Sequence, residues 1–313
     1  MGWVVPWSLI QFEQRHRWRS RKNISSLLQQ YSFVWTREVL AKASDKKNSI
    51  PTSKKIEYIN SLLEIGFDTI DFGSFVSPRA IPQMADTKEV IKGIKAQGTS
   101  SKLLGIVANV RGAEDAAAYS EITYLGFPFS VSETFQQRNT NSSIAESLTR
   151  VQEIQNICIK SGKQLVIYIS MGFGNPYGDI YSEEIVFNWV NKMVELGIET
   201  ISLADTVGLA KPEQVYSMTK YLVKKLPHVE IGVHLHSRPD NWRAKLDAAL
   251  NAGCRRFDGA LKGFGGCPMA NDDLVGNMRT EWMIDYFEEK NLSGDLNKVA
   301  LAKSLQLAPE IFI

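Results

Sequence analysis

The stretch SSIAESLTRVQEIQNICIKSGKQLVIYIS, residues 142–170, joins a helical pattern to a buried strand pattern. Ser143 and Glu146 form a capping-box pattern at the start of an amphipathic run, and Gly162 follows that run as a helix stop. The next run, LVIYIS at 165–170, is rich in β-branched and aromatic residues, as is typical of a strand buried on both faces. A helix followed by a fully buried strand is the repeating unit of a parallel α/β sheet.

The same alternation extends along the chain in both directions. Helical spacing recurs between the apolar runs, for example at 51–66, 211–226 and 241–253. Strands are expected at 31–35, 69–72, 102–110, 122–127, 165–170, 200–205, 230–236 and 256–261. Eight strands alternating with eight helices predict an α/β fold, the (β/α)8 TIM barrel, with its catalytic site at the C-terminal ends of the strands. A doubly wound open sheet is the alternative, which the absence of a dinucleotide fingerprint after the first strand disfavours.

The length and composition of the chain fit one large domain. The chain has 313 residues, 44% of them hydrophobic, which is enough to bury a large core. Residues 1–30 carry five basic side chains and one acid, so we expect a basic extension, disordered or targeting, ahead of a single barrel domain at 31–313. The net charge of +2 does not favour a nucleic-acid partner, and no apolar run reaches the roughly 18 residues that span a membrane. We expect a cytoplasmic protein, or a mitochondrial one if residues 1–30 are a transit peptide.

Three cysteines without a CxxC pair argue against a disulfide framework. Cys158 and Cys254 lie in or just after helical patterns and are expected to be small buried hydrophobes. Cys267 lies instead in the glycine-rich stretch GFGGCPMANDDLVGN, residues 263–277. That stretch is interpreted either as a strained turn or as a mobile catalytic lid that carries a reactive thiol.

A metal site is predicted across three strand ends. His234 and His236 close the seventh strand, and a spacing of two places both imidazoles on one face. Glu38, after the first strand, offers a carboxylate, although Arg37 and Glu38 could instead form a surface ion pair. Asn277 offers an amide oxygen beside the eighth strand. This mixed nitrogen and oxygen set suits Mg²⁺, Mn²⁺ or Zn²⁺.

Polar residues on the fifth and sixth strands are expected to shape a substrate pocket. Tyr168 is placed at the mouth from the fifth strand, and Ser202 and Asp205 come from the sixth. Buried packing or capping is the alternative role for each of them.

Five motifs, taken in order, resemble the 3-hydroxy-3-methylglutaryl-CoA lyase family of barrel metallolyases. The similarity extends from about residue 35 to about residue 285. The motifs are GSFVSPRAIPQMADTKEV (73–90), NTNSSIAES (139–147), SLADTVG (202–208), VHLH (233–236) and the stretch 263–277.

The resemblance implies a metal-dependent retro-Claisen cleavage. A 3-hydroxy-3-substituted glutaryl-CoA would give acetyl-CoA and a keto acid, acetoacetate in the simplest case, so the expected partner is an acyl-CoA substrate; a homodimer is plausible from the family. The metal would be Mg²⁺ or Mn²⁺, with Zn²⁺ as the alternative. The implied metal ligands are Glu38, His234, His236 and Asn277.

The resemblance also implies the catalytic groups. His234 would remove the hydroxyl proton, and Arg37 would bind substrate and stabilise charge on the thioester oxygen. Asp71 would orient Arg37, and Cys267 would protonate the enolate carbon or exclude water from it.

The chain departs from the family pattern in several places. It reads TREVLA at 36–41 where the family usually has Pro-Arg-Asp-Gly-Leu-Gln, so Glu38 replaces an aspartate. Asp71 stands where glutamate is usual, an exchange in the opposite direction. HSRPDNWRAK at 236–245 replaces an HDTYG-like continuation, and Val166 replaces an arginine of the fifth strand. These differences are compatible with another acyl substituent.

Two rival functions remain open. Isopropylmalate and homocitrate synthases use a related barrel with an HxH pair to condense acetyl-CoA with 2-oxo acids, although they usually carry a further C-terminal region. Alternatively, the altered first strand marks a catalytically impaired barrel that only binds a ligand.

Overall fold

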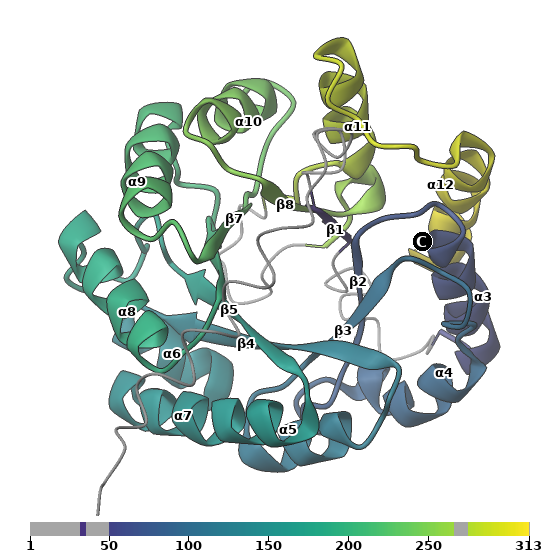
Figure 1. Ribbon diagram of the computed structural model, residues 1–313, viewed down its shortest axis with the longest axis horizontal. Helices are drawn as coiled ribbons and strands as arrows, with labels where there is room; N and C mark the ends of the chain where they lie inside the picture. Colours follow the sequence, from purple (N-terminus) through teal and green to yellow (C-terminus); the bar gives the residue numbers. More distant parts are fainter. Residues whose placement is uncertain (1–31, 36–49, 266–274, 313) are drawn as a thin grey trace, which may run out of the picture.

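The computed structural model describes residues 32–35, 50–265 and 275–312, which form a closed parallel barrel ringed by helices (Figure 1). The eight strands follow one another around the barrel in chain order, and β1 pairs with β8 to close it. The predicted TIM barrel is therefore confirmed, and the open sheet is excluded. The predicted extension at 1–30 lies outside the described residues, and the division at residue 31 stays a prediction.

The strands lie close to their predicted positions. Four predicted ends were too long, because the observed strands end at Ile106, Ala204, His234 and Gly259. At the first of these, Asn109 caps a helix that begins at Val110. The observed strands are β1 Ser32–Trp35, β2 Thr69–Ser74, β3 Lys102–Ile106, β4 Ile122–Ser130, β5 Gln164–Ser170, β6 Thr200–Ala204, β7 Glu230–His234 and β8 Arg256–Gly259.

Helices connect successive strands and cover the outside of the barrel (Figure 1). The capping box of Ser143 and Glu146 is present at the start of α7, and Gly162 ends that helix in the left-handed conformation, as predicted. The helices are α3 Thr52–Leu63, η2 Pro82–Met84, α4 Thr87–Gly93, α5 Val110–Ala117, α6 Glu133–Thr140, α7 Ile144–Ser161, α8 Glu183–Glu195, α9 Pro212–Lys225, α10 Trp242–Asn251, η3 Leu261–Gly263, α11 Thr280–Glu289 and α12 Lys298–Phe312. No helix in the described ranges is both apolar and long enough to cross a membrane.

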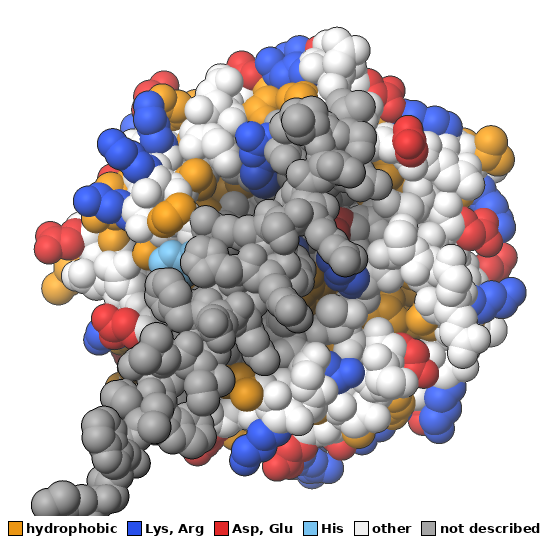
Figure 2. All heavy atoms as spheres, in the orientation of Figure 1, with side chains coloured by type: hydrophobic (Ala, Val, Ile, Leu, Met, Phe, Trp, Pro, Cys, Tyr) orange, Lys and Arg blue, Asp and Glu red, His pale blue; other side chains and the backbone are white. Residues whose placement is uncertain are grey.

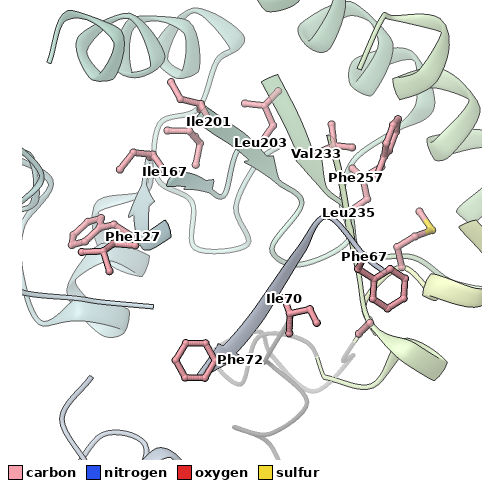
Figure 3. Close-up of a cluster of buried hydrophobic side chains, with 14 of the residues drawn as sticks. Phe67, Ile70, Phe72, Phe127, Ile167, Ile201, Leu203, Val233, Leu235 and Phe257 are labelled. Atoms are coloured by element: carbon pink, nitrogen blue, oxygen red, sulfur yellow. The ribbon is translucent and has the colours of Figure 1, made fainter. Parts of the chain in front are cut away.

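The strands bury apolar side chains on the side that faces the helices. Figure 3 shows such residues from several strands, including Ile70, Ile201 and Val233. Helix residues such as Leu62 and Val190 belong to the same hydrophobic cluster. The core therefore lies mainly between the barrel and its helices, which holds the strand ends in fixed positions.

Polar and charged side chains enter the barrel interior at alternate strand positions. The guanidinium carbon of Arg256 on β8 lies 5.7 Å from the ring centre of Tyr124 on β4. These two strands are opposite in the barrel order, so the contact crosses the interior. On the outside, Figure 2 shows acidic and basic side chains interspersed around the rim of the visible face.

Candidate active site

The end of β7 brings the two predicted imidazoles together. His234 is the last residue of the strand, and the ring centres of His234 and His236 lie 5.6 Å apart. Both side chains are buried. The spacing of two residues therefore places both rings at the C-terminal end of the barrel.

A short chain segment brings Asn277 beside these histidines. His236 and Asn277 form an antiparallel bridge, flanked by hydrogen bonds from the Ser237 amide to the Gly276 carbonyl at 3.0 Å and from the Met278 amide to the Leu235 carbonyl at 3.0 Å. The Asn277 side-chain nitrogen donates to the backbone carbonyl of Phe264 at 2.9 Å. This bond makes the amide oxygen the acceptor end of the side chain, the end that a metal ion would use.

Two glycines allow this segment to approach the loop before it. Gly263 has a φ of +65°, a conformation that side chains disfavour. A Cβ at residue 276 would lie 2.8 Å from the carbonyl oxygen of Gly263, closer than real Cβ atoms come. These two glycines thus have a packing reason that the described residues show. Most of the predicted lid, including Cys267, lies outside the described residues.

We expect Gly276→Ala to displace Asn277, weaken metal binding and lower the free energy of unfolding by about 1–3 kcal/mol, the usual cost of overpacking. Gly294→Ala is the matched control, because a Cβ at residue 294 meets no atom within 4 Å. Isothermal titration with Mn²⁺ and urea unfolding would measure the two effects. Equal Mn²⁺ affinity in the two variants would contradict the role given to the close approach.

Asp258 on β8 is a site residue that the sequence analysis missed. Its Oδ2 accepts a hydrogen bond from the Ser202 hydroxyl at 3.2 Å and lies 3.3 Å from Nδ1 of His234. The Asp258 side chain is fully buried. The available signal was an acid in the middle of the short buried strand at 256–261, two residues from an arginine on the same face.

Tyr168 and Asp71 also face the interior of the barrel. The Tyr168 ring meets the His234 ring edge-on, with 5.9 Å between the ring centres. Burial, supported by the nearby Asp258 carboxylate, raises the pKa of Tyr168 well above its ordinary value, so the group stays a neutral phenol. Asp71 lies between Ile70 and Phe72, which belong to the outer hydrophobic cluster, so its side chain is on the inner face.

Asp205 has the contacts of the capping alternative. Its Oδ2 lies 2.7 Å from Nζ of Lys245, and its Oδ1 accepts the Ala210 amide at 3.0 Å. Both members of the ion pair are 1% exposed. Lys245 also donates to the carbonyl of His236 at 2.9 Å, so the pair connects the loop after β6 to the end of β7. A substrate contact of Asp205 stays a prediction.

The cysteines of the described residues have no reactive character. Cys158 and Cys254 are buried, as predicted, and burial raises the pKa of each thiol to about 12. A thiolate is therefore not formed at neutral pH.

A cavity of about 250 Å³ opens beside Asn277. Its lining includes Arg238, Lys262 and Arg279 together with the Trp282 indole. Three basic side chains around one cavity attract an anionic ligand group.

The donors in the described part of the chain fit a divalent metal only in part. No group of three His, Cys, Asp or Glu side chains gathers there as a metal site. The described donors are two imidazoles and one amide, and the predicted carboxylate, Glu38, lies outside the described residues, as does Arg37. Two nitrogens and an amide oxygen at one strand end still match the chemistry of a site completed by a further oxygen ligand.

A closed barrel with buried imidazoles and carboxylates at the C-terminal strand ends defines a TIM-barrel enzyme site. Comparison with known proteins gives the family. Residues 44–307 match the family model described as HMGL-like, and the chain belongs to this family.

The relatives are named as hydroxymethylglutaryl-CoA lyases. The bovine mitochondrial hydroxymethylglutaryl-CoA lyase is 35% identical over 77% of this chain and 73% of its own length. The hydroxymethylglutaryl-CoA lyase of Bacillus subtilis is 34% identical over 83% of this chain and 85% of its own length. A solved structure of an HMG-CoA lyase from Acenitobacter baumannii, in complex with coenzyme A and 3-methylmalate, has 31% identity and a TM-score of 0.82, covering 93% of each chain. The resemblance noted from the motifs is thereby confirmed.

Proposed function

We propose that the protein cleaves a 3-hydroxy-3-substituted glutaryl-CoA to acetyl-CoA and a keto acid, with 3-hydroxy-3-methylglutaryl-CoA as the simplest substrate. The observation that carries the proposal is the convergence of His234, His236 and Asn277 at the mouth of the barrel. It is supported by the names of the relatives and by the coenzyme A complex of the structural neighbour.

A divalent metal would be held by His234, His236 and Asn277, with Glu38 as the fourth ligand. The family depends on a divalent metal in general, and we propose Mg²⁺ or Mn²⁺ rather than Zn²⁺ for this member. When bound, the metal would polarise the tertiary hydroxyl and fix the substrate geometry.

The residues of the chain would then move the protons. His234 would take the proton of the tertiary hydroxyl at Nε2, because its Nδ1 is directed to Asp258; Nε2 has one lone pair, so binding the metal and accepting the proton would alternate at this nitrogen. The bond between C2 and C3 breaks, its electron pair remains on the acetyl-CoA enolate, and C3 becomes the ketone carbon of the product. Arg37, oriented by Asp71, stabilises the negative charge on the thioester oxygen, and Cys267 donates a proton to the enolate carbon.

Tyr168 and Ser202 complete the pocket wall in this scheme. They lie side by side on β5 and β6, where the strands pair in register. The neutral phenol of Tyr168 shields the His234 ring from water on one side.

Acetoacetate release from 3-hydroxy-3-methylglutaryl-CoA tests the proposal directly. We expect cleavage with Mg²⁺ or Mn²⁺, loss of cleavage with excess EDTA, and recovery when Mn²⁺ is added beyond the chelator. A protein that binds Mn²⁺ without cleaving this substrate would point to another acyl group. A protein that neither binds Mn²⁺ nor cleaves the substrate would support the alternative of a catalytically impaired barrel.

The binding partner and the cellular compartment of the protein are also part of the proposal. The partner is an acyl-CoA, and a homodimer is proposed only by analogy with the family. The relatives include the bovine mitochondrial enzyme and a rat lyase named as cytoplasmic. We propose a cytoplasmic location, with the mitochondrion as the alternative.

A further inference from the structure

A line of buried polar and charged side chains runs inside the barrel and ends at His234, the last residue of β7. Arg256, Asp258 and His234 are all on the inner face of β7 and β8, and their exposed fractions are 0%, 2% and 7%. Asp258 and Arg256 are two residues apart on one strand, so both side chains project to the same side. None of the roles proposed above uses Arg256 or explains why β8 buries two opposite charges.

Arg256 is built into the interior. One guanidinium nitrogen, Nη1, lies 3.2 Å from the Glu230 carboxylate, and the side chain crosses to the Tyr124 ring. The neighbouring strand leaves space for it at Gly232, where a Cβ would lie 3.0 Å from the Cδ and Cγ atoms of Arg256. Burial alone would lower the pKa of Arg256, but the carboxylates of Asp258 and Glu230 more than reverse this effect and raise it.

The geometry at Asp258 determines which imidazole nitrogen of His234 faces the reaction. An ionised carboxylate only accepts hydrogen bonds, so with Asp258 in that form Nδ1 of His234 would carry the proton in the 3.3 Å contact. Nε2 is then the unprotonated nitrogen, able to bind a metal or accept a proton. The Ser202 hydroxyl, 3.2 Å from the same Oδ2, holds the carboxylate in place.

We propose that Asp258 is a positioning residue that fixes the Nδ1–H tautomer and the orientation of His234, and that Arg256 supplies the buried positive charge that offsets Asp258. A buried carboxylate without such a charge is strongly destabilising, which explains the arginine below it. The inference rests on the proposed function only in saying what Nε2 is used for.

The tautomer is tested on the full-length protein, without metal. Two-bond ¹H–¹⁵N spectra of histidine-labelled protein distinguish the tautomers, and His234→Gln identifies the signals of this residue among the four histidines. We expect the Nδ1–H form in the wild type and a population of the Nε2–H form in Asp258→Ala. An Nε2–H wild type, or an unchanged spectrum in Asp258→Ala, would overturn the proposal.

Co²⁺ binding, monitored by the visible absorption of the bound ion, distinguishes a positioning role of Asp258 from simple charge balance with Arg256. Asp258→Ala is expected to weaken Co²⁺ binding by about 10–100-fold, the usual effect of losing the partner of a ligating histidine. The double variant Asp258→Ala/Arg256→Met removes both charges, so we expect it to recover thermal stability without recovering Co²⁺ affinity or the Nδ1–H tautomer. If Asp258→Ala does not fold, the double variant carries the test.

Glu230→Gln is the matched control. It removes the other carboxylate beside Arg256, and its side chain, 38% exposed, is the carboxylate of this group that does not contact His234. We expect wild-type Co²⁺ affinity in this variant. Weakened binding in Glu230→Gln, or recovery of binding in the double variant, would show that Asp258 acts only through charge balance. Absence of lyase activity in a wild type with the expected tautomer would count against the proposed function alone.

Discussion

His234→Gln is expected to lower kcat/KM for 3-hydroxy-3-methylglutaryl-CoA cleavage by roughly 10²–10⁴-fold. The physical reason is that Nε2 of one imidazole has two proposed tasks, performed in turn: binding the metal and accepting the hydroxyl proton. Glutamine occupies a similar volume but is not a base, so the barrel is expected to remain folded. Steady-state kinetics at saturating Mn²⁺, together with Mn²⁺ titration, measure the two losses separately.

His228→Gln is the control for this prediction. His228 is exposed, in the turn before β7, and is not part of the site. The control is expected to keep the wild-type kcat/KM and Mn²⁺ affinity. A His234→Gln protein with unchanged kcat/KM would assign the proton transfer to another residue and would leave His234 a structural role.

Sequence patterns were sufficient to predict the barrel fold and the positions of its strands. Apolar runs with helical segments between them located all eight strands, because a parallel barrel needs strands that are buried on both faces. Errors fell at strand ends, as at 102–110, where the side chain of Asn109 accepts the Gly112 amide and starts a helix. Capping of this kind competes with extension of the strand, and the apolar pattern does not register it.

The contacts between site residues were less predictable. His234 and Asp258 are 24 positions apart in the sequence and lie on neighbouring strands. An apolar run does not show which of its residues face inward, so their contact was not predictable from it. For Asp205 a substrate contact and a capping role were both open, and its partner Lys245 lies 40 positions away on α10, so the sequence did not show the ion pair. Charged residues in otherwise apolar strands were a signal that the sequence analysis did not use, because burial of a charge requires a partner.

Lys245→Met is expected to have the largest effect on stability, lowering the free energy of unfolding by about 3–5 kcal/mol. The substitution keeps the length of the side chain but leaves the Asp205 carboxylate buried without its cation. It also removes the donor to the His236 carbonyl, so Mn²⁺ binding is expected to weaken as well. Urea unfolding monitored by circular dichroism, combined with Mn²⁺ titration, measures both consequences.

Two further variants show whether burial of the ion pair causes the stability loss expected in Lys245→Met. Arg243→Met on the same helix removes an exposed ion pair with Glu289, and the unfolding midpoint is expected to stay near that of the wild type, because solvent screens such pairs. Asp205→Asn/Lys245→Met removes both charges, so it should recover part of the stability lost in Lys245→Met, while the His236 carbonyl still lacks its donor. A double variant less stable than Lys245→Met would mean that the Asp205 carboxylate stabilises the loop after β6 without needing the Lys245 charge. A Mn²⁺ affinity equal to that of the wild type would show that the Lys245 contact does not position His236.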